Sequence, residues 1–146
     1  MVKIFSRFRR DRLAFFRQVR ENYDTIGAIA PSSRFFARTQ AKPLAKLKAR
    51  TDRPVRVLEV GPGTGAVTRQ IVRLLDPGDT FDLVEINPVF VNLLEGLFIN
   101  DPEFSRLCDA STVHAIPLQE FTAENPYDII VSGLPMNNFS AELVEE

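Results

Sequence analysis

The chain has 146 residues, of which 45% are hydrophobic, so it is long enough for one buried core and has room for one domain. Its single cysteine excludes an internal disulfide, and no apolar run reaches the length of a membrane-spanning helix or a signal-peptide core. The net charge of −1 conceals a division, because residues 1–56 hold fifteen of the eighteen lysines and arginines, whereas residues 57–146 hold fifteen of the nineteen acids. These features predict a cytoplasmic α/β protein whose basic front end binds an anionic partner.

Residues 1–22 are predicted to form a basic amphipathic helix, with phenylalanines on one face and arginines on the other. Such a helix suits the headgroup layer of an anionic bilayer, where each basic residue contributes on the order of 1 kcal/mol. Three other interpretations stay open: a helix packed on the domain, a contact with the RNA backbone, and an organellar transit peptide. The predicted membrane-binding residues are Lys3, Phe5, Arg7, Phe8, Arg9, Arg10, Arg12, Phe15 and Phe16.

Residues 23–54 are predicted to form a loop followed by a helix that leads into the core. The helix should span about residues 33–50, with a kink or a restart near Lys42 because of Pro43. Ser32 or Ser33 is the expected N-cap. Ser33 is also a candidate contact for the carboxylate of a bound cofactor.

The segment of residues 55–66 predicts a cofactor loop. A β-branched apolar run stops at Gly61, which is typical of a buried parallel strand, and a helix over 66–75 follows the turn. Gly61, Gly63 and Gly65 let the backbone bend sharply and lie against a nucleotide-type ligand. With Ala66 in the last position, the loop alone also satisfies the fingerprint of dinucleotide-binding dehydrogenases.

Two acids favour a different cofactor. Glu59 precedes the glycines at a strand end, where its carboxylate would repel a pyrophosphate but attract an α-ammonium. Pro62 removes one amide that a phosphate would use. Glu85 ends a second strand over 81–86, where it can accept hydrogen bonds from both ribose hydroxyls of an adenosine. Together they predict S-adenosylmethionine, with contacts from Glu59, Gly61, Pro62, Gly63, Thr64, Gly65, Glu85 and Ile86.

Beyond the second strand, Asn87 should cap a helix that runs to about residue 100, and a third strand is expected over 111–116. The adenine contact would then fall to Leu118 or Gln119. His114 lies inside the third strand, which favours a structural role.

The fourth predicted strand covers residues 127–132, and ligands bind at the carboxyl ends of strands in open α/β sheets. Its end is therefore the candidate acceptor site, formed by Ser132, Gly133, Leu134 and Pro135. Met136 stands where a flat base would need an aromatic stacking partner, which favours a lipid amine over an RNA base.

The segments 26–34, 57–65 and 83–88 resemble those of the bacterial phospholipid N-methyltransferases, which methylate phosphatidylethanolamine, and of the related ornithine-lipid enzymes. The resemblance implies a class I S-adenosylmethionine-dependent methyltransferase with a Rossmann-like parallel sheet of order 3-2-1-4. It also implies a lipid amine substrate, no metal, no DNA, and peripheral attachment to an anionic membrane. The chain resembles RNA adenine dimethyltransferases as well, so RNA is the alternative substrate.

Full class I methyltransferases build seven strands in the order 3-2-1-4-5-7-6, whereas four are predicted over the core of residues 55–146. We therefore expect either a shortened and inactive form or a half-domain that a partner completes. The fourth strand should then be an exposed edge that is open to self-association.

Overall fold

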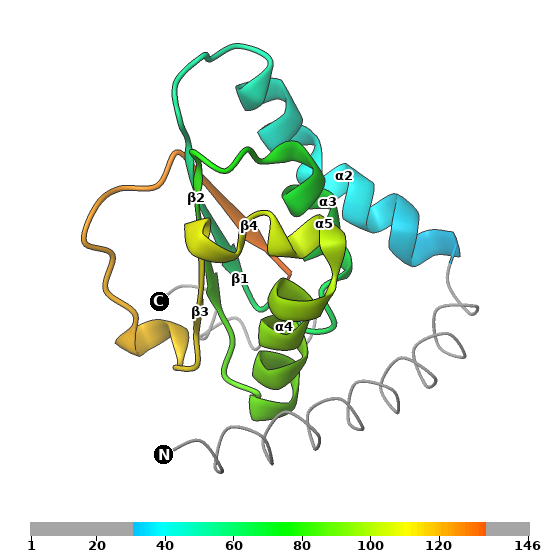
Figure 1. Cartoon of the computed structure of the whole chain (residues 1–146), viewed down its shortest axis with the longest axis vertical. Helices are drawn as coiled ribbons and strands as arrows, with labels where there is room; N and C mark the ends of the chain where they lie inside the picture. Colours follow the sequence, from blue (N-terminus) through cyan, green and yellow to red (C-terminus); the bar gives the residue numbers. More distant parts are fainter. Residues whose placement is uncertain (1–30, 134–146) are drawn as a thin grey trace, which may run out of the picture.

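The computed structural model describes residues 31–133 and contains a parallel four-stranded sheet of order β3-β2-β1-β4 (Figure 1). This order confirms the predicted Rossmann-like arrangement. The strands are β1 (Arg56–Val60), β2 (Thr80–Val84), β3 (Ser111–His114) and β4 (Ile129–Ser132). Because the pairing is parallel throughout, all four carboxyl ends meet at one edge of the sheet.

Helices cover one face of the sheet. They are α2 (Pro31–Lys48), α3 (Ala66–Leu74), α4 (Pro88–Asn100) and the short α5 (Pro102–Ser105), and two 3-10 turns follow, η1 (Cys108–Ala110) and η2 (Leu118–Glu120). The alternation of strand side chains turns Val57, Phe81 and Leu83 toward these helices to form the main core. Leu58, Val60 and Val84 face the other way, where the connection over 115–128 packs on them. No helix within residues 31–133 is long and apolar enough to span a bilayer.

The start and the continuity of α2 differ from the sequence predictions. The helix begins at Pro31, so Ser32 and Ser33 lie in its first turn and neither is the N-cap. It also continues through Pro43 as a single helix, so the predicted restart near Lys42 is wrong, whereas the alternative prediction, a kink, stays a prediction. The proline lies on the solvent side, where water can bond the carbonyl that loses its amide partner, and the inner side is held by buried Ala41 and Leu44.

Asp79 ties α2 to the sheet. Its Oδ1 accepts a hydrogen bond from the Val55 amide at 2.8 Å, and its Oδ2 accepts from the Lys48 ammonium at 2.7 Å and from the Asp76 amide at 2.8 Å. Burial opposes ionisation of Asp79, but these donors outweigh it and hold the pKa of the carboxyl below its ordinary value. The buried carboxylate thus joins α2 to the start of β1.

Candidate cofactor site at the carboxyl edge of the sheet

The glycine loop lies between β1 and α3 and has the backbone geometry that its sequence predicts. Gly61, Gly63 and Gly65 have φ values of +65°, +55° and +84°, a region that side chains rarely adopt. The loop closes through a hydrogen bond of 3.0 Å from the Gly65 amide to the Pro62 carbonyl. A Cβ added at Gly63 would meet nothing within 4 Å, so this side of the loop is open to a ligand.

Glu85 follows β2 and binds the loop to the start of α4. Its Oε2 accepts from the Gly63 amide at 3.0 Å, and its Oε1 accepts from the Asn87 amide at 2.8 Å. Asn87 caps α4 as predicted, since its Oδ1 accepts from the Val89 amide at 2.9 Å. Each carboxylate oxygen has further lone-pair capacity, so Glu85 can keep these amides and still accept from two hydroxyls. Sequence reasoning missed the structural role of Glu85, and its contact with ribose hydroxyls stays a prediction.

Glu59 lies on the helix-covered face of β1 and is fully buried, with 0% exposure. Neither of its carboxylate oxygens has a hydrogen-bond partner, and the buried Thr68 hydroxyl of α3 has none either. Burial raises the pKa of Glu59 from 4.5 to about 8; the nearby Thr68 hydroxyl opposes this shift, and the charge of Glu85 adds to it. A buried carboxylate without a donor would be stabilised by a cationic group placed beside it.

Two exposed apolar side chains lie beyond the ends of neighbouring strands. Ile86 follows β2 and is 67% exposed, and Leu118 opens η2 after β3 and is 43% exposed. The Glu85 amide donates to the His114 carbonyl at 3.0 Å, which joins the two strand ends. Gln119 is exposed beside Leu118. Leu118 and Gln119, the predicted adenine contacts, and Ile86, a predicted cofactor contact, are thus exposed beyond these strand ends.

The end of β4 meets the glycine loop. The Gly133 amide donates to the Val60 carbonyl at 2.8 Å, and a Cβ on Gly133 would lie 2.5 Å from the Gly61 carbonyl oxygen, so only glycine fits. Ser132 and Gly133, two predicted acceptor residues, therefore lie directly beside the cofactor loop. Leu134, Pro135 and all nine predicted membrane-binding residues lie outside the described residues, as does the side chain of Ser33.

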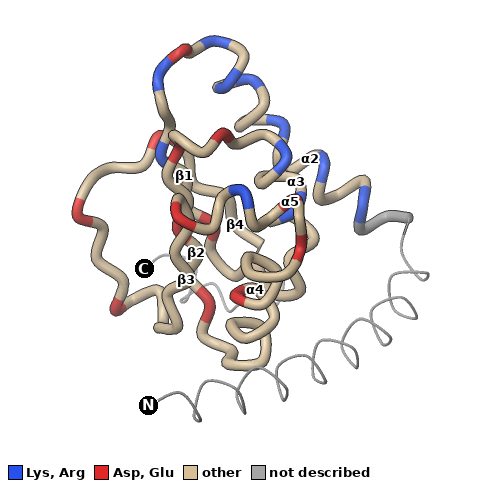
Figure 2. Tube along the Cα trace, in the orientation of Figure 1, with Lys and Arg blue, Asp and Glu red and all other residues tan. Residues whose placement is uncertain are grey.

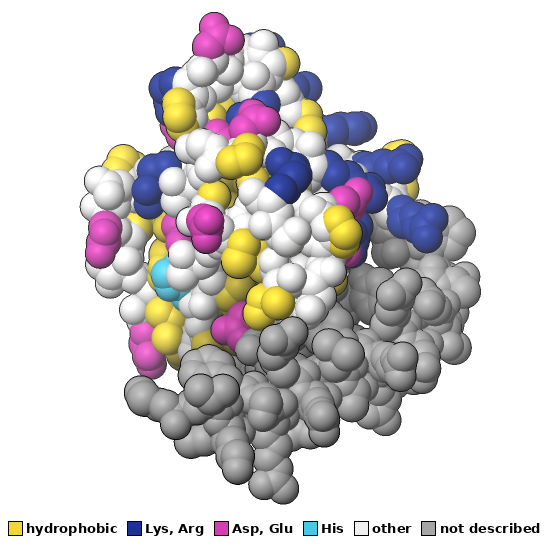
Figure 3. All heavy atoms as spheres, in the orientation of Figure 1, with side chains coloured by type: hydrophobic (Ala, Val, Ile, Leu, Met, Phe, Trp, Pro, Cys, Tyr) yellow, Lys and Arg dark blue, Asp and Glu magenta, His cyan; other side chains and the backbone are white. Residues whose placement is uncertain are grey.

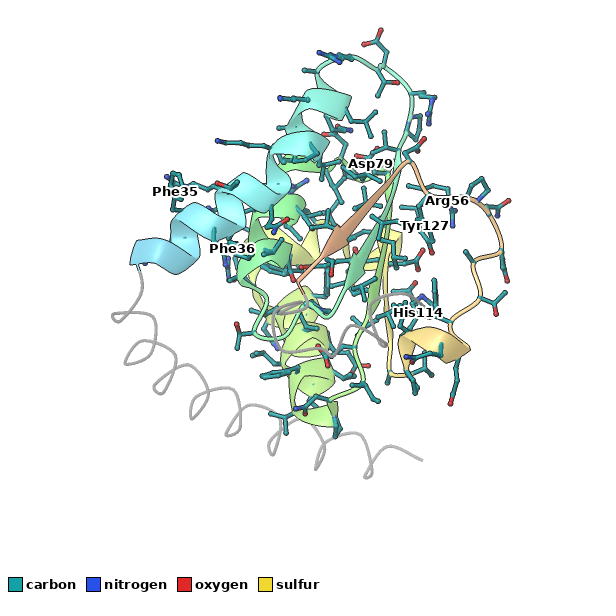
Figure 4. All side chains as sticks on the ribbon, turned by 180° about the vertical axis from the view of Figure 1, so that it is seen from behind. Phe35, Phe36, Arg56, Asp79, His114 and Tyr127 are labelled. Atoms are coloured by element: carbon teal, nitrogen blue, oxygen red, sulfur yellow. The ribbon has the colours of Figure 1, made fainter. Side chains whose placement is uncertain are left out.

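A polar cluster on the opposite face of the sheet was missed by the sequence reasoning. Asp82 accepts from the Tyr127 hydroxyl at 2.7 Å, and its other oxygen lies 2.8 Å from His114 Nε2. The Arg56 guanidinium lies 3.8 Å from the same carboxylate and 5.2 Å from the centre of the Tyr127 ring (Figure 4). Burial raises the pKa of Tyr127 to about 12, and Asp82 adds to this shift. His114 is thus a structural residue, as expected.

Comparison with known proteins identifies relatives. Over 119 residues the chain is 34% identical to the ornithine lipid N-methyltransferase of Singulisphaera acidiphila, a match that covers 81% of this chain and 58% of that protein. Over 64 residues it is 39% identical to the ribosomal RNA small subunit methyltransferase A of Pseudomonas syringae, covering 44% of this chain and 22% of that one. No protein-family model matches the chain.

Among solved structures, a protein of Galdieria sulphuraria proposed to be a sarcosine dimethylglycine methyltransferase aligns with a TM-score of 0.52 and 28% identity, over 66% of this chain and 34% of that one. The chain thus spans less than two thirds of the length of each of these three proteins. The comparisons confirm the predicted class I methyltransferase fold and the homology to a lipid N-methyltransferase.

Proposed function

We propose that this homologue of ornithine lipid N-methyltransferase binds S-adenosylmethionine at its glycine loop and methylates the amine headgroup of a membrane lipid at the end of β4. The observation that carries the proposal is the presence of two buried acids near that loop, Glu59 in the strand before it and Glu85 bonded to it. Glu59 has no hydrogen-bond partner for either oxygen, and Glu85 accepts from the loop itself. A ligand that is cationic at one end and a ribonucleoside at the other satisfies both acids.

The roles of the residues follow from this placement. Glu59 would hold the α-ammonium, Glu85 the ribose hydroxyls, and the exposed Ile86 and Leu118 the adenine faces. The cofactor, when bound, supplies an activated methyl group on a sulfonium. The protein then has to place an amine lone pair in line with the sulfur–methyl bond, so positioning supplies much of the rate. We assign this positioning to the main chain around Ser132 and Gly133, which lie against the loop.

The first test measures cofactor affinity in Glu85→Ala. Removing the carboxylate deletes two charge-assisted hydrogen bonds to the ribose, each worth about 1.5–3 kcal/mol, and releases the Gly63 amide. We expect calorimetry with S-adenosylmethionine to show affinity falling about a hundredfold or more. The control is Glu124→Ala, an exposed acid in the 115–128 connection, which should bind like the wild type. Unchanged affinity in Glu85→Ala would refute the assigned ribose role.

A membrane-bound substrate is supported by the described part of the basic front end. Phe35 of α2 is 72% exposed and projects away from the sheet (Figure 4), and its neighbour Phe36 is 54% exposed. Basic residues follow one another along the same helix (Figure 2), and their side chains gather on the surface beside it (Figure 3). Within residues 31–133, four of them have no ion-pair partner, namely Arg34, Arg38, Lys42 and Lys46. Exposed aromatic rings among unpaired cations suit the interface of an anionic bilayer, to which the protein would attach peripherally.

The second test measures flotation with vesicles that contain anionic phospholipid. The double variant Phe35→Ser/Phe36→Ser should bind at least about tenfold more weakly, because each phenylalanine contributes about 1.5–3 kcal/mol when it leaves water. Ile99→Ser is the matched control, since Ile99 is 60% exposed on α4. A wild-type protein that ignores vesicles and binds structured RNA would instead support an RNA adenine methyltransferase, the function named for the Pseudomonas syringae relative.

A further inference from the structure

We infer that Glu59 is a proton-linked cofactor switch: it is neutral in the empty site, and it loses its proton to solvent when the α-ammonium of the cofactor binds. The inference rests on the proposed function and adds a coupling between cofactor affinity and pH. It follows from the surroundings of one carboxyl group.

The first observation is that the Glu59 carboxyl group is buried without a hydrogen-bond partner. Glu59 is 0% exposed, and both of its oxygens lack a hydrogen-bond partner. Its neighbours across the sheet are Leu83 on β2 and Val131 on β4, which are both apolar and buried. A charged carboxylate in such a place loses its hydration without compensation, whereas a neutral carboxyl loses far less.

The second observation is that no described cation compensates the charge. The helices on this face turn apolar residues inward, such as Leu44 of α2 and Leu94 of α4. Four cations of α2 are exposed to solvent, namely Arg34, Arg38, Lys42 and Lys46. The half-buried Lys48 pairs with Asp76 and Asp79. Arg69 of α3 likewise pairs with Asp101 and Glu103, and Arg73 pairs with Glu103.

Two neighbouring groups, Thr68 and Glu85, also act on the pKa of Glu59, but together they do not overcome the effect of burial. The Thr68 hydroxyl of α3 acts toward ionisation, but it has no hydrogen-bond partner in the structure. The nearby titratable group is Glu85, whose negative charge opposes ionisation of Glu59. With burial, this leaves the pKa of Glu59 at about 8, so most of the empty protein carries a neutral Glu59 at pH 6.5.

A bound ammonium reverses the balance. It supplies a positive charge and N–H donors to a carboxylate that has neither, which favours the charged form. The proton on Glu59 is then released to solvent, and no covalent bond forms or breaks. The ammonium itself brings its full charge at pH 6.5, because α-amino groups titrate at about 7.7–8.0. Proton release at this pH therefore comes from the protein.

The experiment is calorimetry of the wild-type chain with S-adenosylhomocysteine, which carries the same ammonium and cannot transfer a methyl group. Titrations at pH 6.5 in two buffers of different ionisation enthalpy give the number of protons released. We expect close to one proton per bound ligand, and an affinity that rises about tenfold per pH unit between pH 6 and pH 7. Methylthioadenosine, which lacks the amino-acid part, is the control ligand and should bind without releasing a proton.

Variants assign the proton to its residue. Glu59→Gln should bind S-adenosylhomocysteine more weakly, release no proton and lose the pH dependence of affinity, whereas the exposed Glu124→Gln should match the wild type. Wild-type binding without proton release overturns the inference, and so does unchanged release in Glu59→Gln. Absence of any binding by the folded wild type refutes the proposed function instead. The wild-type titrations decide the matter even if Glu59→Gln does not fold.

Discussion

Replacing Glu59 by glutamine is expected to stabilise the protein at alkaline pH, although it removes a predicted ligand contact. The pKa of Glu59 is raised from 4.5 to about 8 by burial in the folded protein. Between these values the folded state binds one proton more than the unfolded state, so the free energy of unfolding of the wild type falls as the pH rises. Glutamine does not titrate, so the free energy of unfolding of Glu59→Gln does not fall with pH for this reason.

The magnitude follows from the shift, because each pKa unit corresponds to about 1.4 kcal/mol. The stability advantage of Glu59→Gln should be about 4 kcal/mol larger at pH 8.5 than at pH 5. Urea unfolding at the two pH values, in the absence of cofactor, measures it. Glu124→Gln, an exposed acid, should show no such change between the two pH values. A pH-independent difference for Glu59→Gln would mean that Glu59 is already ionised when the site is empty.

This trade between stability and function has a physical cause. The proposed ammonium site keeps a carboxyl group without a hydrogen-bond partner when no ligand is bound, and this lowers the stability of the ligand-free protein. Bound cofactor should therefore stabilise the wild type more than it stabilises Glu59→Gln.

The second large effect is expected for Asp82→Ala. Asp82 is 8% exposed and accepts from Tyr127 and from His114, with Arg56 beside it. Removing the carboxylate leaves these three groups without their partner, and breaking such a buried arrangement costs about 3 kcal/mol or more. Urea unfolding at pH 7 should show this loss. Asp52→Ala, at an exposed position before β1, should change stability by less than about 0.5 kcal/mol.

A spectroscopic measurement distinguishes loss of the hydrogen bond between Asp82 and Tyr127 from a general loss of stability. The pKa of Tyr127, about 12 in the wild type, should move back toward its ordinary value of 10 in Asp82→Ala. Tyr23 is the other tyrosine, so an absorbance titration follows two groups, and Tyr127→Phe identifies which one moves. A late-titrating tyrosine that persists in Asp82→Ala would contradict the assigned role of Asp82.

The cluster also bears on the proposed site. Tyr127 and Phe121 belong to the connection over 115–128, and the Phe121 ring lies 4.9 Å from the His114 ring. The same connection carries Leu118 and Gln119, the predicted adenine contacts. Asp82 thus holds one end of a segment that the proposed cofactor would contact.

The sequence by itself determined the elements whose signals are local. The apolar run before Gly61, the three glycines that need positive φ, and the Asn87–Pro88 start of α4 each depend on residues within one turn of one another. The sequence also predicted the two acids that we propose to hold the cofactor, because their distance from the glycine turn is a matter of chain position.

The tertiary structure alone decided which of these residues are buried and what they touch. Pro43 stays inside a helix because its outer side faces solvent, and Glu85 bonds an amide 22 residues earlier in the chain. Glu59 lacks a partner, and Asp82 has three, because strands distant in sequence bring different neighbours to the two faces of the sheet. The energy of each of these buried groups depends on contacts between segments that are distant in the sequence. No local pattern along the chain indicates such contacts directly.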